Sequence, residues 1–314
     1  MEQFIINWLI NIPVFAAPLL LACLGLIVTA KSGILNLGAE GMMAMGALGG
    51  VVVVLEGGNL YFALLVAICA GALLSLVFGV ATILFKVDQV LAGLIIVATG
   101  VGLSGVLGRS YALRPISGFD RLHPGFLTDI PWIGLIVFGQ DMIVYITPVV
   151  VILVWWAIYK TTIGLHLRAV GEDPSTADAA GVNVTRYRLG AVVVGGALCG
   201  LAGGYLSLAA GQVWVEHMVA GRGWIAVALA IFSRWRPFPA VVGALIFGGT
   251  EAIIPRIQTL GGDMPVYVLL MLPYLLTLAV LIIPSVFFKR ALDEAPKGLL
   301  KNYLREERSY TKTQ

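Results

Sequence analysis

Long apolar runs separated by short polar segments dominate this chain. A run of about 20 apolar residues crosses roughly 30 Å of hydrocarbon as an α-helix that rises 1.5 Å per residue. The pattern therefore predicts an all-α, polytopic transmembrane helical bundle of about nine spans, with eight to ten as the range. The expected spans are 12–30, 35–55, 60–85, 89–108, 141–159, 189–210, 222–234, 238–254 and 266–286.

Two of these segments leave alternatives open. Segment 222–234 is short for a full crossing, so it is expected to be tilted or re-entrant. Residues 2–11 form either an interfacial helix or a tenth span.

The composition agrees with a membrane protein. The chain is 59% hydrophobic and 12% charged, whereas a soluble domain carries about 25% charged residues. A larger soluble core does not explain the excess, because single cores stop growing near about 250–300 residues.

The basic residues predict an orientation, because cytoplasmic loops are enriched in Lys and Arg. With the C-terminus inside, fifteen of the 20 Lys and Arg residues lie on the cytoplasmic side. We therefore expect a multi-pass protein of the cytoplasmic membrane in which residues 1–290 form the transmembrane domain and residues 291–314 a basic cytoplasmic tail. Segment 160–188 is then an inside loop and segment 109–140 an outside loop.

Glycine recurs at helical spacing in two of the spans. Close approach over small residues is what holds helices together in lipid, where there is little hydrophobic drive between them. Helix packing within the chain is the main interpretation, and packing against a partner subunit is the alternative. The residues concerned are Gly46, Gly50, Gly196, Gly200 and Gly204.

The chain lacks the motifs of a membrane enzyme. It has no Gly-x-x-x-x-Gly-Lys-Ser/Thr phosphate loop, no His-Glu-x-x-His and no Cys-x-x-Cys, and its three histidines are scattered. We expect no catalytic residue, no metal site and no cofactor. The net charge of +3 is modest and gives no reason to expect nucleic acid as a partner.

The inside loop contains a short helix with capping residues at both ends, from residue 173 to residue 181. Asp173 suits the N-cap, Pro174 the first helical position and Gly181 the residue just past the end. Such a capped, acidic helix either docks into a soluble partner or is an ordinary loop. The candidate coupling residues are Gly171, Glu172, Asp173, Pro174, Ala179, Ala180 and Gly181.

A carboxylate lies inside the second span. Glu40 is surrounded by apolar and glycine residues, and an ionisable group in a membrane faces the bundle interior or water. Asn36 is four residues earlier, which places both side chains on one helix face. Asn36, Glu40 and Met43 either line a solute pathway or brace the helix start through backbone donors near Gly38 and Gly41.

The same two stretches carry a family resemblance. Segment 32–43, Ser-Gly-Ile-Leu-Asn-Leu-Gly-Ala-Glu-Gly-Met-Met, resembles the signature of permeases in the branched-chain amino acid and ribose class of ABC importers. Within that class it is most similar to the nucleoside and simple-sugar branch. Segment 171–182 resembles the cytoplasmic coupling segment of the family.

The resemblance implies a complex and a fold. Two permease subunits, identical or related, form the pore, two cytoplasmic ATPase subunits drive it, and an extracytoplasmic binding protein or lipoprotein delivers the solute. The implied fold is similar to that of the vitamin B12-type importers. The outside loop is basic at Arg109, Arg114 and Arg121, so it either presents a docking surface to the binding protein or is a solvated loop with incidental charge. A secondary, ion-coupled transporter is the alternative class.

Overall fold

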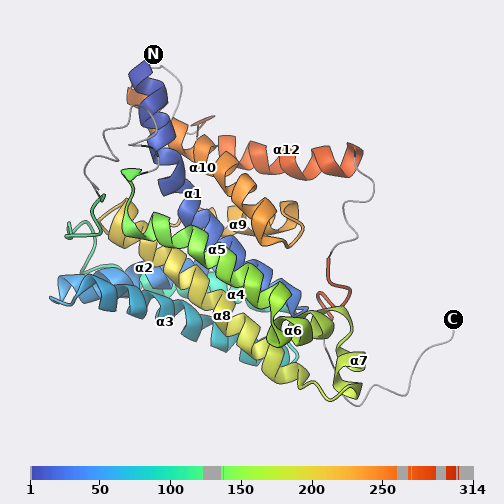
Figure 1. Ribbon diagram of the computed structural model, residues 1–314. Helices are drawn as coiled ribbons and strands as arrows, with labels where there is room; N and C mark the ends of the chain where they lie inside the picture. Colours follow the sequence, from blue (N-terminus) through green and yellow to red (C-terminus); the bar gives the residue numbers. More distant parts are fainter. Residues whose placement is uncertain are drawn as a thin grey trace.

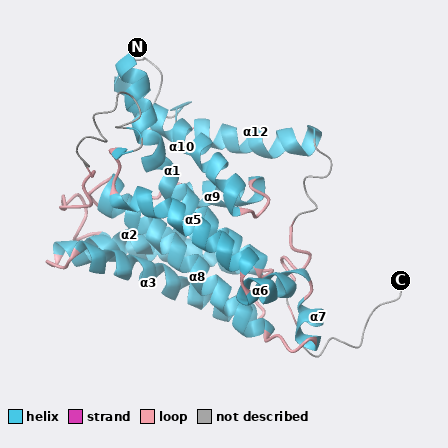
Figure 2. Ribbon diagram, viewed as in Figure 1, coloured by secondary structure: helices cyan, strands magenta, loops and turns pink. Residues whose placement is uncertain are grey.

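The structure is a computed structural model that describes residues 2–122, 136, 138–259, 268–269, 271–287, 295–301 and 303. Within these ranges it consists of helices and connecting loops, as Figure 2 shows, with two isolated β-bridges, Pro115–Val213 and Arg121–Asp141. The all-α prediction is confirmed over this part of the chain.

Helices α1, α3, α5 and α8 run in roughly the same direction through the bundle, and the shorter α6 and α7 lie together at one end of it (Figure 1). The helices are α1 (Glu2–Lys31), α2 (Ala39–Leu55), α3 (Leu60–Gly79), α4 (Gln89–Gly108), α5 (Met142–Lys160), α6 (Thr162–Glu172), α7 (Pro174–Ala179), α8 (Val184–Tyr205), α9 (Arg222–Phe232), α10 (Pro237–Thr259) and α12 (Leu272–Phe287). Single π-helical segments extend α3 over Val80–Leu84 and α8 over Leu206–Ala210.

The expected count of nine spans is not confirmed. Six helices in the described ranges are long and apolar enough to cross a membrane, and two more apolar helices, α2 and α9, are shorter. At 1.5 Å per residue, the 11 residues of α9 extend about 17 Å. That is well short of the roughly 30 Å of hydrocarbon.

Several helix boundaries differ from those expected. Residues 2–11 belong to α1 itself and form neither a separate interfacial helix nor a tenth span. The second span begins at Ala39 and not at residue 35, because Gly33 adopts φ +86° and the chain stays non-helical until Gly38. The expected loop 160–188 is largely helical, since it contains α6, α7 and the start of α8.

Helix α1 lies at the centre of the bundle. It packs against α5, α8, α9 and α10. In its most apolar 18-residue stretch 78% is buried, against 28% in the corresponding stretches of α4 and α5. The outward faces of α3, α4 and α5 carry exposed apolar side chains, among them Leu73, Ile95 and Leu153. These faces suit contact with lipid or with another membrane subunit.

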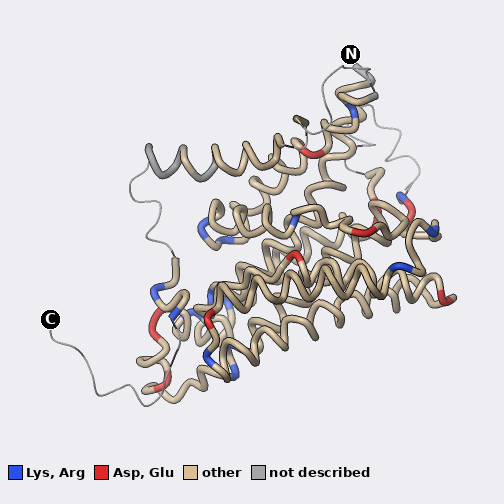
Figure 3. Tube along the Cα trace, turned by 180° about the vertical axis from the view of Figure 1, so that it is seen from behind, with Lys and Arg blue, Asp and Glu red and all other residues tan. Residues whose placement is uncertain are grey.

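Charged residues gather at the ends of the long helices, and most of the tube between them is uncharged (Figure 3). This distribution is what a low-dielectric environment around the middle of the bundle requires, because an ionised side chain is costly there.

Glycines bring the backbones of α2, α3 and α8 into contact. A methyl group added at Gly200 would collide with the carbonyl oxygen of Ala67, and one added at Gly46 would collide with the carbonyl oxygen of Gly200. A Cβ added at Gly196 would collide with the side chain of Ser75, and one added at Gly204 would lie 2.6 Å from the Ala67 Cβ. In the structure, these residues are therefore used for packing within the chain.

This packing predicts a position-specific effect of one methyl group. Gly200→Ala should destabilise the subunit by about 1–3 kcal/mol, because a backbone carbonyl cannot move aside as a side chain can. Gly102→Ala, in α4, is the matched control, since nothing lies within 4 Å of its added Cβ. Thermal unfolding of the detergent-purified variants measures the difference, and equal melting temperatures would contradict the assignment.

Candidate functional site

The carboxylate of Glu40 binds the N-terminus of another helix. Glu40 lies in the first turn of α2, and its two oxygens accept hydrogen bonds from the backbone N–H groups of Gly221 and Gly223, each at 2.7 Å. Gly221 is the N-cap residue of α9, with φ +84° and no capping side chain of its own. Glu40 therefore supplies the cap that α9 lacks, and its negative charge meets the positive end of the helix dipole.

A second carboxylate fixes the same helix end through a side chain. Arg222, the first residue of α9, donates its Nε–H to Glu251 Oε2 of α10 at 2.9 Å. The Arg222 Nη1 group also donates to the carbonyl oxygens of Met218 and Val219. Both partners of the ion pair are largely buried. Helices α2, α9 and α10 thus meet at one charged junction, which we call the α9 junction: Glu40, Gly221, Arg222, Gly223 and Glu251.

Asn36 has a different role from the one expected. It precedes α2, so the expectation that it shares a helix face with Glu40 is wrong. Its Oδ1 accepts the N–H of Gly38 at 2.8 Å, which forms a local turn into the helix. The donors to Glu40 also differ from the expected ones near Gly38 and Gly41, because they come from α9, about 180 residues away in the sequence.

The segment between α1 and α2 is held on several sides. The Arg188 Nε–H of α8 donates to the Ser32 carbonyl oxygen at 3.2 Å, and the Leu35 N–H donates to Gln89 Oε1, at the start of α4, at 2.8 Å. Glu40 adds the contact with α9. The segment 32–40 therefore connects α1, α2, α4, α8 and α9. Its irregular backbone is compatible with the interior of a membrane protein because its polar groups find partners there.

Glu40 also borders a cavity. A cavity of about 160 Å³ lies beside it and is lined in addition by Ser104 and by part of segment 214–221. Met43, in contrast, is fully buried, and its carbonyl oxygen lies against Gly203 of α8. Of the three candidate residues, Glu40 is the one whose side chain reaches both the α9 junction and a cavity.

Helix α7 has the N-cap, first residue and C-terminal glycine that the sequence predicts. Asp173 is the N-cap of α7, where its Oδ1 accepts the N–H groups of Ser175 and Thr176, and Pro174 follows at the first position. Gly181 lies beyond the C-cap Ala180 and adopts φ +85°. Hydrogen bonds from the hydroxyl groups of Ser175 and Thr176, together with those from the two N–H groups, lower the pKa of Asp173 to about 2. The carboxylate is therefore ionised at any physiological pH.

The predicted coupling residues divide into an exposed and an anchoring group. Glu172, Asp173, Ala179, Ala180 and Gly181 are exposed, and Pro174 is half-buried. They form a small, acidic surface at the end of the bundle. Gly171, in contrast, is buried.

Gly171 ties this surface to the C-terminal tail and to the end of α1. A Cβ added at Gly171 would collide with the carbonyl oxygen of Lys31. The carbonyl oxygen of Gly171 accepts the Gly298 N–H at 2.8 Å. The Arg188 Nη1 group donates to the Lys301 carbonyl oxygen at 3.2 Å. The described part of the expected basic tail, residues 295–301 and 303, thus packs against the segment that precedes α7.

The three arginines of the outside loop are all exposed. Arg121 donates from Nη2 to Asn11 Oδ1 of α1 at 3.1 Å. The loop around them is anchored by backbone hydrogen bonds, because the N–H groups of Leu113 and Ile116 donate to the carbonyl oxygens of Trp214 and Gln212. Arg109 is the C-cap residue of α4, and Arg114 lies in the anchored loop. His123 of the same expected loop lies outside the described residues.

Sequence reasoning missed three polar residues of the interior. Glu251 and Arg188 are buried, as is Asp141, which caps α5 and accepts the hydroxyl hydrogen bond of Tyr205 at 2.9 Å. The signal that identified Glu40, an ionisable residue in an apolar run, was equally present at Glu251. Arg188 and Asp141 lie at the ends of expected spans, where charged residues are common and carry less information.

These features define a polytopic membrane protein with buried polar junctions and an exposed, capped helix at one end. Residues 8–283 match the family model described as "Branched-chain amino acid transport system / permease component". The chain therefore belongs to this permease family, and it is a membrane subunit for transport and not an enzyme.

Three relatives cover nearly the whole chain. The "Putative glucose ABC transporter permease protein TsgC13" of Haloferax volcanii is 38% identical over 95% of this chain and 98% of its own length. The "Guanosine ABC transporter permease protein NupQ" of Bacillus subtilis is 34% identical over 94% of this chain and 95% of its own. The "Nucleoside ABC transporter permease protein NupC" of Lactococcus lactis is 31% identical, with 95% and 96% covered.

The α9 junction predicts the outcome of replacing Glu40. In Glu40→Gln one oxygen still accepts an N–H, but the amide NH2 opposes the second N–H. The folded state should lose about 1–2 kcal/mol, as for a lost helix cap. Protein yield should fall while the preference among solutes stays the same. Glu40→Ala should have the larger effect.

Glu56→Gln is the matched control, because Glu56 follows α2 and its partner, the Tyr111 hydroxyl, is exposed. Yield in membranes and competition between nucleosides and sugars in uptake are the measurements. A normal yield with an altered solute preference in Glu40→Gln would assign Glu40 to the solute pathway instead.

Proposed function

We propose that this chain is the membrane-spanning permease subunit of an ATP-driven ABC importer for nucleosides or related simple sugars. The observation that carries this proposal is the family match, which extends over residues 8–283 and so includes every described helix except the ends of α1 and α12. A match of this extent concerns the whole membrane domain and not one motif.

The solute class is supported by the relatives and by the sequence. The named solutes of the three relatives are glucose, guanosine and nucleosides. The segment 32–43 resembles the nucleoside and simple-sugar branch, and it forms the connection that the α9 junction secures. Nucleosides and simple sugars share a hydroxylated ring, so one pathway chemistry can serve both.

Energy must enter from partner subunits, because the chain has no phosphate-binding loop of its own. We assign the contact with the ATPase to α7 and its flanking residues. Helix α7 is short and exposed, and a small apolar cluster of Val170, Ala177 and Val184 holds it in place. Gly171, which precedes α7, bonds to Gly298, and Arg188, which follows it, bonds to Ser32. Through these contacts a displacement of α7 would be passed on to segment 32–40.

Two further partners belong to the proposal. The exposed apolar faces of α3, α4 and α5 can accommodate lipid and a second permease subunit. The exposed residues Arg109 and Arg114, with Arg121, can meet carboxylates of an extracytoplasmic binding protein or lipoprotein. We also retain the expectation of a vitamin B12-type architecture and of a cytoplasmic C-terminus.

Reconstitution with the cognate ATPase and binding protein tests the function and the coupling together. The wild-type complex should take up labelled nucleoside or sugar only with ATP. Gly181→Val should lower uptake and solute-stimulated ATP hydrolysis together, because a β-branched residue at φ +85° costs about 1–2 kcal/mol. Gly181→Asn, which tolerates this φ, should retain most of both activities. Uptake driven by an ion gradient without ATP would overturn the proposal, and wild-type activity of Gly181→Val would remove α7 from the coupling contact.

The proposed orientation is tested with an impermeant thiol reagent on intact cells. In a background without Cys23, Cys69 and Cys199, cysteines at positions Ser175 and Ser309 should resist labelling. A cysteine at Ser110, on the opposite loop, should react and serves as the control. Labelling of Ser175→Cys from outside would invert the topology.

A further inference from the structure

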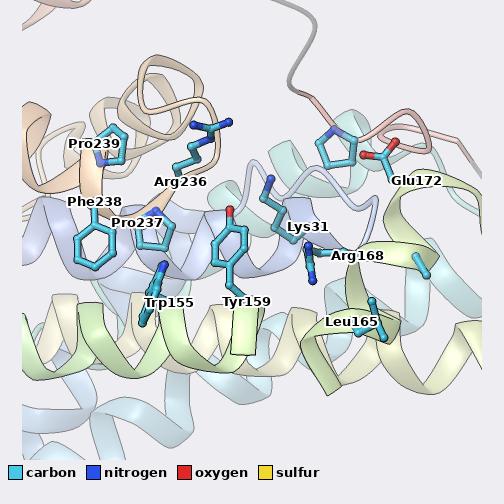
Figure 4. A pocket seen from close by; sticks show the side chains of 12 residues that line it. Lys31, Trp155, Tyr159, Leu165, Arg168, Glu172, Arg236, Pro237, Phe238 and Pro239 are labelled. Carbon is cyan, nitrogen blue, oxygen red and sulfur yellow. The ribbon is translucent and has the colours of Figure 1, made fainter. Parts of the chain in front are cut away.

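A cavity of about 720 Å³ opens at the end of the bundle that carries α6 and α7. It lies between the end of α1, the last turns of α5, helix α6 and the start of α10 (Figure 4). Of the candidate coupling residues, Glu172 lines this cavity. No residue of the α9 junction does.

The polar part of this cavity is basic. Lys31, Arg168 and Arg236 line it, with Glu172 as the acidic residue among its lining side chains. Figure 4 shows these side chains around one space, with Tyr159 between the two arginines. The Arg168 guanidinium lies 5.3 Å from the centre of the Tyr159 ring, which orients it by a cation–π contact. Among the described side chains that line the cavity, the cations therefore outnumber the carboxylates, which favours an anionic ligand.

The other part of the cavity is aromatic and apolar. The rings of Trp155 and Phe238 lie 5.5 Å apart. Phe238 is 51% exposed and Leu165 55% exposed, so the apolar wall is continuous with the outer surface of the bundle. Val242, one turn beyond Phe238 in α10, extends this exposed apolar surface away from the cations. A ligand that fills both parts carries an anionic group and an apolar chain.

We propose that this cavity binds the headgroup of an anionic phospholipid. The phosphate lies among Lys31, Arg168 and Arg236, and an acyl chain follows Phe238 and Val242. Basic pockets between membrane helices near the surface recognise such headgroups, and tryptophan and tyrosine are the aromatic residues enriched at this depth. A neutral nucleoside or sugar has no charge to match three cations, so the cavity is not assigned to the transported solute.

A photoactivatable phosphatidylglycerol analogue tests this site in the full importer complex, reconstituted in phosphatidylcholine vesicles. The analogue should label peptides of α5, α6 and the start of α10, whereas a photoactivatable phosphatidylcholine should label them much less. Peptide mapping by mass spectrometry reads out the position. The readout does not require transport, so its failure is distinguishable from failure of the proposed function.

Charge variants test the role of the cations. A double variant, Arg168→Gln with Arg236→Gln, should lower labelling by about fivefold for each cation removed. The pair Arg168→Lys with Arg236→Lys keeps the charge and should retain most of the labelling, which separates loss of charge from loss of fold. Arg186→Gln, at the same end of the bundle but outside this cavity, is the control and should label as the wild type does.

Three outcomes would overturn the proposal. Equal labelling by both lipid analogues would show that the headgroup charge is not recognised. Equal labelling of the Gln and wild-type proteins would remove the arginines from the site. Full competition by inorganic phosphate at low ionic strength, without competition by added phosphatidylglycerol, would assign the cavity to a soluble phosphate compound.

Discussion

The contact on which much of this structure depends is a carboxylate bound to the start of a helix that it does not belong to. Helix α9 begins at a half-buried glycine N-cap that has no side chain to accept the first N–H groups, and Gly223 in its first turn is buried. Glu40 supplies the missing acceptors, and the ion pair Arg222–Glu251 fixes the same end from α10. A short helix of 11 residues thereby becomes part of the bundle. The same contact holds the irregular segment 32–40 at the meeting point of α1, α2, α4 and α8.

The transport subunit thus has two separate polar regions with different demands. In the α9 junction, Arg222 pairs with Glu251, while the Glu40 carboxylate accepts backbone N–H groups at the positive end of the α9 dipole. The surface around α7 is exposed and is built from local caps, with Asp173 ionised at physiological pH. Arg188 lies between the two, since it contacts Ser32 on one side and Lys301 on the other. This arrangement gives the exposed end of the protein a short physical connection to the interior.

Local features of this protein were predictable from its sequence, and long-range ones were not. The caps of α7 follow from residues within one short segment, so Asp173, Pro174 and Gly181 could be placed correctly. A buried partner for Glu40 could be expected from the cost of a charge in lipid. The identity of that partner could not be predicted, because Gly221 is 181 residues away in the sequence. It donates through its backbone N–H, which no side-chain pattern reveals. Span limits were misplaced where hydropathy continues across a break in the helix, as at Gly33 and Asn36.

The glycine contacts have a consequence for how the subunit can move. Where Gly46 and Gly71 lie against Gly200, backbone touches backbone, and no side chain is present whose rotation could absorb a shift. Helices α2, α3 and α8 are therefore expected to travel as one rigid body. A rearrangement of the subunit is therefore expected to be taken up outside this group of three helices.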